Sequence, residues 1–368
     1  MAGRKLFKGN EAVAEAAIRA GCRFFFGYPI TPQNEIPEYM SRRLPEVGGT
    51  FVQAESEVAA INMVYGAAGA GARVMTSSSS PGISLKQEGI SYLAGAQLPC
   101  LIVNMVRGGP GLGGIAPAQS DYFQATKGGG HGDYRLIVYA PASVQEMVDL
   151  TLGAYDVAER YRIPVMILGD GVLGQMMEPV SFPEGSEPEN APQRPEPEWA
   201  TRGARGGRAP RIVSSIYLKP EELYKHNLRL QEQFKRAEAA ETRYEEVRTD
   251  DAEVLLVAYG TTSRVCRSAV EKLRTAGVRA GLFRPITVSP FPYKALGERA
   301  RQVKAVLTVE MSLGQMVDDV RIAVAGAAPV DFLGTTGGVV PKAADIVERA
   351  AALARHGAAD QATREGIS

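Results

Sequence analysis

The sequence predicts an α/β protein built from two doubly wound domains, and three observations support this fold class. Apolar segments of strand length alternate with segments of helical periodicity over most of the 368 residues. The chain is also longer than one typical core requires. A stretch from Pro179 to Pro210 holds seven of the 23 prolines and divides the chain. We therefore expect a first domain at 1–178, a Pro/Gly-rich linker with a charged helix at 179–250, and a second domain at 251–368.

In the first domain, helix and strand signals follow one another as in a parallel sheet. The segment at 9–22 is GNEAVAEAAIRAGC, which has the apolar spacing of a helix, and FFFGYPITP at 24–32 indicates a buried strand that ends in a turn. Ser143 and Glu146 form a capping box, which marks the start of one helix. The other predicted elements are strands at 73–77, 100–105, 136–139 and 164–168 and helices at 83–95 and 144–160.

Beyond the linker, residues 220–247 predict a charged helix on the surface between the domains. Its apolar docking points are expected to be Leu223, Leu228, Leu230 and Phe234. A second α/β unit follows. Its sequence shows no group of catalytic residues. Its polar turns at 260–262 and 310–315 suit packing or subunit contact. Its predicted elements are strands at 253–258, 278–283 and 304–309, a further short strand, and helices at 263–276, 292–301, 314–326 and up to about 354.

Composition excludes several classes of protein. The formal net charge is zero, which argues against a protein that binds nucleic acid or anionic membranes electrostatically. The basic run RGARGGR at 202–208 has one aromatic residue nearby, Trp199, and is therefore interpreted as a solvated linker. The polar start and the short apolar segments show no signal peptide or membrane span, so we expect a cytoplasmic protein.

No metal site is predicted. Gly169, Asp170 and Gly171 could open a motif that binds magnesium and a diphosphate, but the asparagine that this motif needs about 25 to 30 residues later would fall in the linker. We therefore interpret this segment as a turn that ends a strand. Cys22, Cys100 and Cys266 lack paired spacing, which indicates packed thiols rather than an iron–sulfur cluster or a zinc site.

The stretch from Phe51 to Gly82 combines a short strand, an acidic turn, a small-residue helix, a second strand and a hydroxyl-rich turn. Glu57 begins the helix, whose residues are apolar on nearly every face, so this helix is predicted to be buried. A carboxylate in that place is favoured as an anion by the helix N-terminus and as a neutral acid by desolvation, and the sequence leaves this balance open. Glu55 and Glu57 are equally consistent with ordinary first-turn acids.

Two other loops place polar side chains at strand ends. Pro29 and Pro32 restrict the backbone around Thr31, which suits either a ligand contact or a rigid connector. Arg107 follows another strand and precedes a Gly-rich loop that we expect to be flexible. Its guanidinium could hold a small carboxylate with two parallel hydrogen bonds or tie down its own loop. His131 in the same region could carry protons or be incidental.

Four motifs together resemble a known family. They are GYPITP at 27–32, QAESEVAA at 53–60, TSSSSPG at 76–82 and VRGGPG at 106–111, and they look like the alpha-type subunit of 2-oxoacid:ferredoxin oxidoreductases. The resemblance continues through the VAYGTTSR and FRPITVSPFP segments and covers nearly the whole chain. It implies a pyrimidine-binding domain of thiamin diphosphate enzymes, followed by a domain like the C-terminal one of transketolase. The segment at 119–134 looks most like the branched-chain (2-oxoisovalerate) members, with the 2-oxoglutarate members second.

The resemblance implies an enzyme that oxidatively decarboxylates a 2-oxoacid to its acyl-coenzyme A and CO₂ while reducing an external ferredoxin. This chain would bind the pyrimidine end of thiamin diphosphate. A beta-type partner subunit would hold the diphosphate and magnesium, and gamma-type and ferredoxin-like subunits would complete the complex, with iron–sulfur clusters on other subunits only. A non-catalytic scaffold subunit and a self-sufficient thiamin decarboxylase are the alternatives.

The resemblance also implies roles for individual residues. Glu57, not Glu55, would hydrogen-bond to N1′ of the aminopyrimidine. Thr31 would hydrogen-bond to the 2-oxoacid, and Arg107 would hold its carboxylate. The residues implied to line the pyrimidine pocket are Tyr28, Pro29, Ile30, Ser80 and Gly82.

Overall fold

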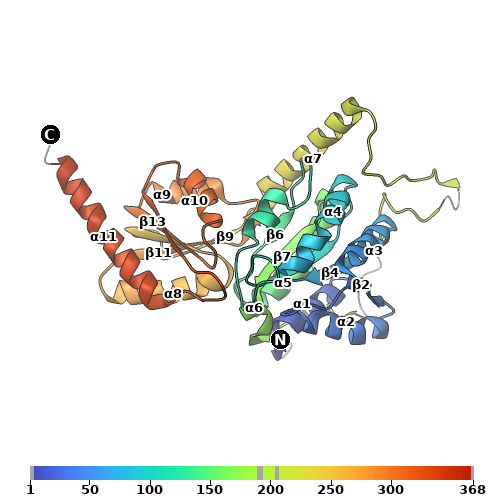
Figure 1. Ribbon diagram of the computed structural model, residues 1–368, viewed down its shortest axis with the longest axis horizontal. Helices are drawn as coiled ribbons and strands as arrows, with labels where there is room; N and C mark the ends of the chain where they lie inside the picture. Colours follow the sequence, from blue (N-terminus) through green and yellow to red (C-terminus); the bar gives the residue numbers. More distant parts are fainter. Residues whose placement is uncertain (1–3, 189–193, 204–206, 366–368) are drawn as a thin grey trace.

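A seven-stranded sheet carries the first part of the chain (Figure 1). The structure, a computed structural model, describes residues 4–188, 194–203 and 207–365. All neighbouring strands in this sheet are parallel except the pair that β12 forms with β6, which confirms the doubly wound fold. In sheet order the strands are β12 (Thr287–Ser289), β6 (Ile137–Tyr139), β7 (Val165–Asp170), β5 (Leu101–Val106), β4 (Val74–Ser78), β2 (Phe24–Gly27) and β3 (Thr50–Gln53).

Helices cover both faces of this sheet because its strands are apolar on both sides. Along β5, Ile102 belongs to one core cluster and Leu101 and Val103 belong to the other, as the alternation of side chains along a strand requires. The helices are α1 (Gly9–Arg19), α2 (Glu35–Glu46), α3 (Glu57–Gly69), α4 (Ser80–Gly95), α5 (Val144–Tyr161) and α6 (Gly171–Gln175), with a π-helical turn η1 (Gln124–Gly128).

The second domain has a five-stranded sheet in which only β9 is antiparallel to its neighbour. The strands are, in sheet order, β14 (Val330–Gly334), β13 (Ala305–Glu310), β10 (Val254–Val257), β11 (Ala280–Pro285) and β9 (Tyr244–Val247). The helices are α8 (Gly260–Thr275), α9 (Tyr293–Ala300), α10 (Met316–Val324) and α11 (Ala343–Glu365). None of the helices in the described part of the chain combines the length and apolar character of a membrane span.

Two short segments differ from the sequence prediction. The helix predicted to reach residue 247 is α7 (Pro220–Glu241), and residues 244–247 form β9 instead. These residues are strand because Glu245 pairs with Arg284 and Arg267 while Glu246 pairs with Arg299, contacts that a continued helix would not supply. A two-stranded antiparallel sheet of β1 (Lys5–Lys8) and β8 (Met177–Val180) was not predicted either.

The solvated run predicted at 202–208 is exposed at Arg202, Gly203 and Gly207, but the stretch just before it packs onto the first domain. Trp199 donates from Nε1 to the Ala68 carbonyl over 2.9 Å and lies under the guanidinium of Arg162, while Ala200 is fully buried. The chain therefore packs over the C-terminal end of α3, because one large aromatic side chain supplies enough apolar contact to fix a polar segment. Of the run at 202–208, residues 204–206 lie outside the described residues.

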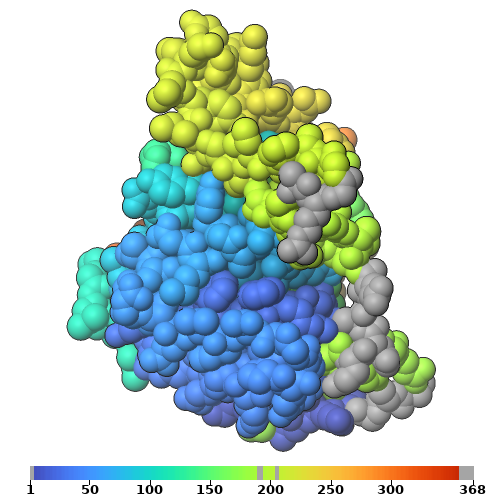
Figure 2. All heavy atoms as spheres, turned by 90° about the vertical axis from the view of Figure 1, so that its right-hand side faces the viewer, coloured from blue at the N-terminus to red at the C-terminus, as the bar shows by residue number. Residues whose placement is uncertain are grey.

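Helix α7 contacts the rest of the chain through other residues than the predicted ones. Leu223 and Leu228 are exposed, Leu230 and Phe234 are half-buried, and the buried side chains are those of His226, Ala237 and Glu241. Nε2 of His226 lies 2.7 Å from the Gly95 carbonyl. Figure 2 shows the yellow atoms of this part of the chain projecting beyond the blue and cyan first domain.

The Gly-rich loop after β5 joins the two domains. Its second half was expected to be flexible, but Gln119 lies buried in the second domain. Its backbone N–H donates to Met311 O over 2.8 Å, its Nε2 donates to Tyr259 O over 2.9 Å, and its Oε1 accepts from Met311 N. Tyr122 adds a hydrogen bond to Asp319. The predicted packing role of the turns at 260–262 and 310–315 is therefore confirmed, and their partner is this loop.

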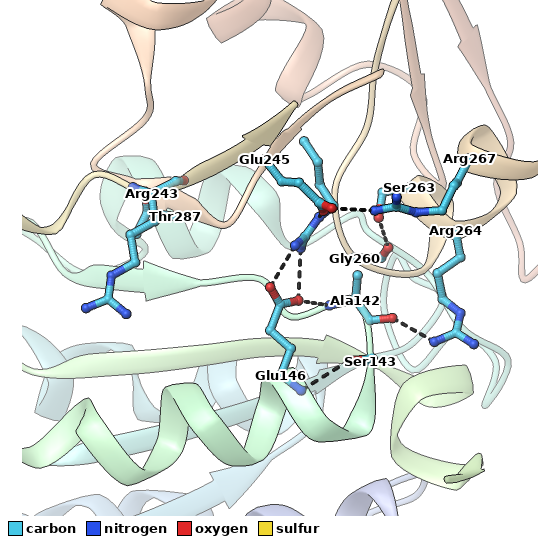
Figure 3. A network of polar contacts seen from close by, with 11 residues as sticks. Ala142, Ser143, Glu146, Arg243, Glu245, Gly260, Ser263, Arg264, Arg267 and Thr287 are labelled. Carbon is cyan, nitrogen blue, oxygen red and sulfur yellow. Dashed lines mark hydrogen bonds and ion pairs between the residues drawn. The ribbon is translucent and has the colours of Figure 1, made fainter. Parts of the chain in front are cut away.

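A second contact between the domains centres on Arg284, which is buried. Figure 3 labels two carboxylates of this contact, Glu146 on α5 and Glu245 on β9. Its Nη1 and Nη2 donate to the two carboxylate oxygens of Glu146 over 2.9 and 2.7 Å, and its Nε donates to Glu245 over 2.7 Å. Glu146 belongs to the capping box at the start of α5, so one arginine connects the first domain to β11 and β9 of the second.

Replacing Arg284 with methionine is expected to lower the free energy of unfolding by about 3 kcal/mol, because two partly buried carboxylates lose their shared cation. Chemical denaturation of the full chain measures this change. The control is Arg321→Met, which removes a solvent-exposed ion pair with Asp318 and should change stability by less than about 0.5 kcal/mol. If both substitutions lowered the free energy of unfolding equally, the buried contact of Arg284 would stabilise the chain no more than an exposed ion pair does.

Candidate functional site

Glu57 lies where α3 begins, directly after the carboxyl end of β3. Ser56 caps the helix, its Oγ accepting from Ala59 N, which turns the first residue of α3 toward the sheet. The side chain of Glu57 is only 6% exposed, whereas that of Glu55 is exposed. No hydrogen bond to the Glu57 carboxylate is made by the residues that the structure describes. A buried carboxylate without a donor is a candidate for a ligand contact.

The prediction that α3 is buried on nearly every side is wrong. Ala60, Ile61 and Val64 are buried, but Val58 and Met63 on the other side are 43% and 36% exposed. One side of the helix packs against α4 and the sheet, and none of the residues that the structure describes covers Val58 and Met63 on the other side. Exposed large apolar residues next to a buried acid are typical of an interface.

Two glycines on α4 set its distance from α3. A Cβ on Gly82 would lie 2.7 Å from Glu57 Oε1 and 2.1 Å from Ser78 Oγ, and one on Gly89 would lie 2.4 Å from Ile61 Cγ2. Gly82 therefore lets the backbone of α4 approach Glu57 and Ser78 more closely than any residue with a side chain could. The hydroxyls of Ser78 and Ser79 are buried without hydrogen-bond partners among the described residues.

Lys86 was missed by the sequence analysis. It is fully buried on α4, and its Nζ donates to Thr76 Oγ1 over 2.7 Å and to Ser77 O over 3.0 Å. Burial lowers the pKa of this lysine to about 7, against a smaller opposing effect of the negative charge of Glu57. The available signal was helical spacing, because Lys86 lies three residues after Ile83 and four before Ile90 and so shares their side of the helix.

Arg107 and Thr31 lie together, as the resemblance implies. Nη1 of Arg107 donates to Thr31 O over 2.9 Å and Nη2 donates to Leu112 O over 3.0 Å, while Nε is buried without a partner. The guanidinium thus ties its own loop to the turn at Thr31, the structural alternative considered above, with only two of its five N–H donors. Ser80 Oγ accepts from Arg107 N over 3.0 Å, so this hydroxyl is already used inside the protein.

The remaining pocket residues lie at the open side of the site. Tyr28, Pro29 and Thr31 are exposed and Ile30 is half-buried. Nearby, Gln33 is fully buried and accepts from Ser77 Oγ over 2.5 Å, while its Nε2 has no partner. The sequence analysis did not identify Gln33, because one glutamine after a proline carries no pattern.

Two residues that were considered lie outside this group. His131 is exposed, 3.4 Å from Ser91 Oγ near the far end of α4, and nine residues of helix between Gly82 and Ser91 correspond to about 14 Å. Asp170 was interpreted as part of a turn, but its Oδ1 accepts from Val172 N and Leu173 N and begins the short helix α6. An N-cap aspartate has its oxygen lone pairs engaged by the helix.

A model of the family described as pyruvate flavodoxin/ferredoxin oxidoreductase, thiamin diphosphate-binding, matches residues 15–248. The chain belongs to this family. A second model, for core domain II of pyruvate:ferredoxin oxidoreductase, matches residues 252–346. The resemblance noted in the sequence is therefore confirmed: the chain is a subunit of a thiamin diphosphate-dependent 2-oxoacid:ferredoxin oxidoreductase.

Curated relatives and solved structures agree with this family. The chain is 54% identical over 345 residues to the ketoisovalerate oxidoreductase subunit VorB of Methanothermobacter thermautotrophicus, covering 94% of this chain and 96% of that protein. It is 39% identical to the 2-oxoglutarate synthase subunit KorA of the same organism, covering 92% and 96%. The 2-oxoglutarate:ferredoxin oxidoreductase from Magnetococcus marinus superposes with a TM-score of 0.83 at 26% identity, covering 96% of this chain and 65% of that one. A split-gene transketolase, with a TM-score of 0.59 at 16% identity, shares the fold.

The residues at this edge fit the pyrimidine end of thiamin diphosphate. The Glu57 carboxylate has no donor from the described residues, Gly82 brings only backbone against it, and Ser78 Oγ and Gln33 Nε2 lack partners. A ring with several nitrogen atoms can satisfy such groups, since each nitrogen is a donor or an acceptor. The roles of the individual residues remain predictions.

Proposed function

We propose that this chain binds the aminopyrimidine of thiamin diphosphate through Glu57 and serves in the oxidative decarboxylation of branched-chain 2-oxoacids, 2-oxoisovalerate above all. The observation that carries the proposal is the buried Glu57 carboxylate, which has no donor from the described residues and lies against the backbone of Gly82 at the start of α4. When bound, the cofactor supplies the electron sink that decarboxylation of a 2-oxoacid requires. Glu57 would hold or release a proton at N1′, and Gly82 would let the ring approach.

We further propose that a beta-type subunit holds the diphosphate and magnesium and covers this site. The support is the exposure of the large apolar side chains of Val58, Met63, Leu85 and Tyr28 around Glu57. Gamma-type and ferredoxin-like subunits would complete the complex and carry the iron–sulfur clusters, with coenzyme A and an external ferredoxin as further reactants. The three cysteines of this chain are buried separately, and burial raises the pKa of the Cys100 thiol to about 12. A cytoplasmic location also remains a prediction.

The division of the chain into 1–178, 179–250 and 251–368 is kept as a proposal, with the first part as the pyrimidine-binding domain and the last as the transketolase-like one. It is supported by the two family models, which meet between residues 248 and 252. Strand β9 lies inside the middle part but pairs with the second sheet, so the middle part is not a linker throughout.

Arg107→Lys is expected to lower kcat/KM for the 2-oxoacid by about tenfold or more, because a lysine has one point charge where the arginine has a planar fork. Two of the five guanidinium N–H groups bond to Thr31 O and Leu112 O, so Nε, which has no partner, and the second N–H of each terminal nitrogen remain for a carboxylate. Steady-state kinetics of the assembled complex check this. If kcat/KM for the 2-oxoacid is unchanged in the Arg107→Lys complex, Arg107 only holds its own loop and does not bind the substrate.

The assembled complex is expected to prefer 2-oxoisovalerate over 2-oxoglutarate by at least about tenfold in kcat/KM. A second substrate carboxylate needs another cation, and the motifs at 27–32, 76–82 and 107–118 contain no basic residue besides Arg107. The similarity to a ketoisovalerate oxidoreductase subunit also supports a preference for 2-oxoisovalerate. Co-purification of the native complex and assay of a panel of 2-oxoacids with ferredoxin or a viologen dye test this.

A 2-oxoglutarate enzyme is the second candidate, because the chain also resembles 2-oxoglutarate synthase subunits and the Magnetococcus enzyme. Faster turnover of 2-oxoglutarate at low substrate would favour it and would leave the role of Glu57 intact. In the isolated chain Leu112 and Ile115 are exposed rather than forming an apolar wall, so selectivity would depend on how the partner subunit orders this loop.

A further inference from the structure

The turn that follows β2 is exposed at Thr31 but anchored directly behind it. Thr31 is exposed, whereas the next two residues, Pro32 and Gln33, are buried. Nη1 of Arg107 donates to Thr31 O over 2.9 Å, and Ser77 Oγ donates to Gln33 Oε1 over 2.5 Å. These two contacts tie the turn to the carboxyl ends of β5 and β4.

The carbonyl of Pro32, between these two contacts, is held by amide side chains from two helices. Nδ2 of Asn10, on the first turn of α1, donates to Pro32 O over 2.8 Å. Nε2 of Gln175, the last residue of α6, donates to the same oxygen over 3.0 Å. A carbonyl oxygen has two lone pairs, so both are satisfied by side chains here.

Glu35 orients the two amides. Its Oε2 accepts from Asn10 Nδ2 over 2.7 Å and from Gln175 Nε2 over 2.9 Å, and Lys8 Nζ donates to Oε1 over 3.3 Å. Burial alone would raise the pKa of Glu35, but these hydrogen bonds lower it below its ordinary value, so the side chain is a carboxylate. A carboxylate only accepts, so it selects the nitrogen of each amide, and the second N–H of each nitrogen is directed to Pro32 O.

Stability alone does not account for this arrangement. Asn10 is fully buried, and its Oδ1 has no hydrogen-bond partner among the described residues. A buried polar atom without a partner is unfavourable for folding. Helices α1 and α6 also lie very close together: a Cβ on Gly9 would lie 2.0 Å from Leu173 O, and one on Gly174 would lie 2.6 Å from Asn10 Oδ1. This close approach lets both amides reach one carbonyl.

We propose that Asn10 and Gln175 are positioning residues that fix the turn at Thr31, so that the Thr31 hydroxyl is in place to hydrogen-bond to the 2-oxoacid. Thr31 must bind the substrate for this to hold, so the inference rests on the proposed function and on the role that the family resemblance implies for Thr31. Asn10 and Gln175 act only through Pro32 O and do not touch the substrate. Asn10 has the larger share, because it is buried and Gln175 is exposed.

Steady-state kinetics of the assembled complex test this positioning role. Asn10→Leu and Gln175→Met remove the amide donors and keep roughly the size of each side chain. The double variant is expected to lower kcat/KM for 2-oxoisovalerate by about 10- to 100-fold, because a small displacement of a binding group has an effect of this order. The KM for coenzyme A should stay within about twofold of the wild type, since coenzyme A does not depend on Thr31. Unchanged kcat/KM for 2-oxoisovalerate in the folded double variant would overturn the inference.

Thr31→Val distinguishes positioning from a general effect on the fold. This substitution removes the hydroxyl and keeps the backbone carbonyl that Arg107 contacts. In the Thr31→Val background, loss of the two amides should change kcat/KM by less than about twofold, because no hydroxyl remains to be positioned. An equal fold-loss in both backgrounds would overturn the inference. Wild-type kcat/KM in Thr31→Val alone would instead overturn the substrate role of Thr31, and the inference with it.

Gln145→Met is the matched control for stability. Gln145 also ties a helix to a distant backbone: its Nε2 donates to Ser181 O over 3.0 Å and its Oε1 accepts from Ser181 N over 2.8 Å. It should lower Tm about as much as Gln175→Met does and leave kcat/KM unchanged. An equal loss of kcat/KM in both variants would contradict a specific role of the turn.

Should Asn10→Leu fail to fold, Gln175→Met alone decides the question. Its side chain is exposed, so the variant is expected to fold. The loss in kcat/KM for 2-oxoisovalerate should then be about threefold, which corresponds to one weak hydrogen bond. A wild-type value of kcat/KM in Gln175→Met would overturn the inference in that case.

Discussion

Replacing Glu57 with glutamine should lower the turnover of the assembled complex by about 10² to 10⁴ while the complex still forms. Glutamine has the size of glutamate and keeps one hydrogen bond, but its amide cannot hold and release a proton. The carboxylate is buried and has no hydrogen-bond donor among the described residues, so nothing nearby replaces this function. Steady-state assay with a 2-oxoacid, coenzyme A and a viologen dye measures the loss.

Glu55→Gln is the matched control. Glu55 lies two residues away, on the same turn before α3, but its side chain is exposed. Its replacement should leave turnover within a few-fold of the wild type. Equal losses at the two positions would undo the assignment of Glu57, and unchanged turnover in Glu57→Gln would favour a scaffold subunit without a catalytic role.

Gly82→Ala is expected to reduce turnover by about a hundredfold, because displacement of a reacting group by less than 1 Å can have that effect. The new Cβ would lie 2.7 Å from Glu57 Oε1 and 2.1 Å from Ser78 Oγ, so both side chains must move. Alanine favours a helix over glycine by about 1 kcal/mol, so helix propensity alone predicts no loss of stability. The expected pattern is weaker binding of thiamin diphosphate and slower turnover in a folded complex.

Gly153→Ala provides the comparison for this substitution. Gly153 is an exposed residue of α5, and an added Cβ there would meet nothing within 4 Å. This variant should keep full turnover and the same or a slightly higher Tm. If Gly82→Ala behaved in the same way, the close approach of α4 to Glu57 would not be needed for cofactor binding.

The sequence was sufficient for the fold because its local signals agree with the tertiary structure. The capping box at Ser143 marks the first turn of α5, and the alternation of apolar strands and helices gives the order of the parallel sheet. The misassigned segments are those whose conformation depends on distant partners. Residues 244–247 are a strand because of arginines on β11, α8 and α9, and Trp199 fixes its segment on α3.

The candidate site was predictable only in part, for a similar reason. Glu57, Thr31 and Arg107 belong to motifs that can be matched in sequence, and the structure places Arg107 against Thr31. Lys86 and Gln33 belong to no motif, and their burial under β4 follows from the packing of α4 and of the turn before α2. The exposed side of α3 could not be foreseen either, because an apolar helix sequence does not say whether its cover comes from the same chain.

Strand β12 has a consequence for any attempt to study the thiamin-binding half alone. It comes from residues 287–289, well inside the second domain, yet it forms the edge of the first sheet beside β6. A fragment ending near residue 250 would lose this strand together with the partners of Gln119, and would present the unpaired edge of β6 to solvent. Open apolar edges recruit strands from other molecules. The two halves match separate family models, yet the first sheet is completed by a strand from the second half, so we expect a fragment ending near residue 250 to aggregate more readily than the full chain.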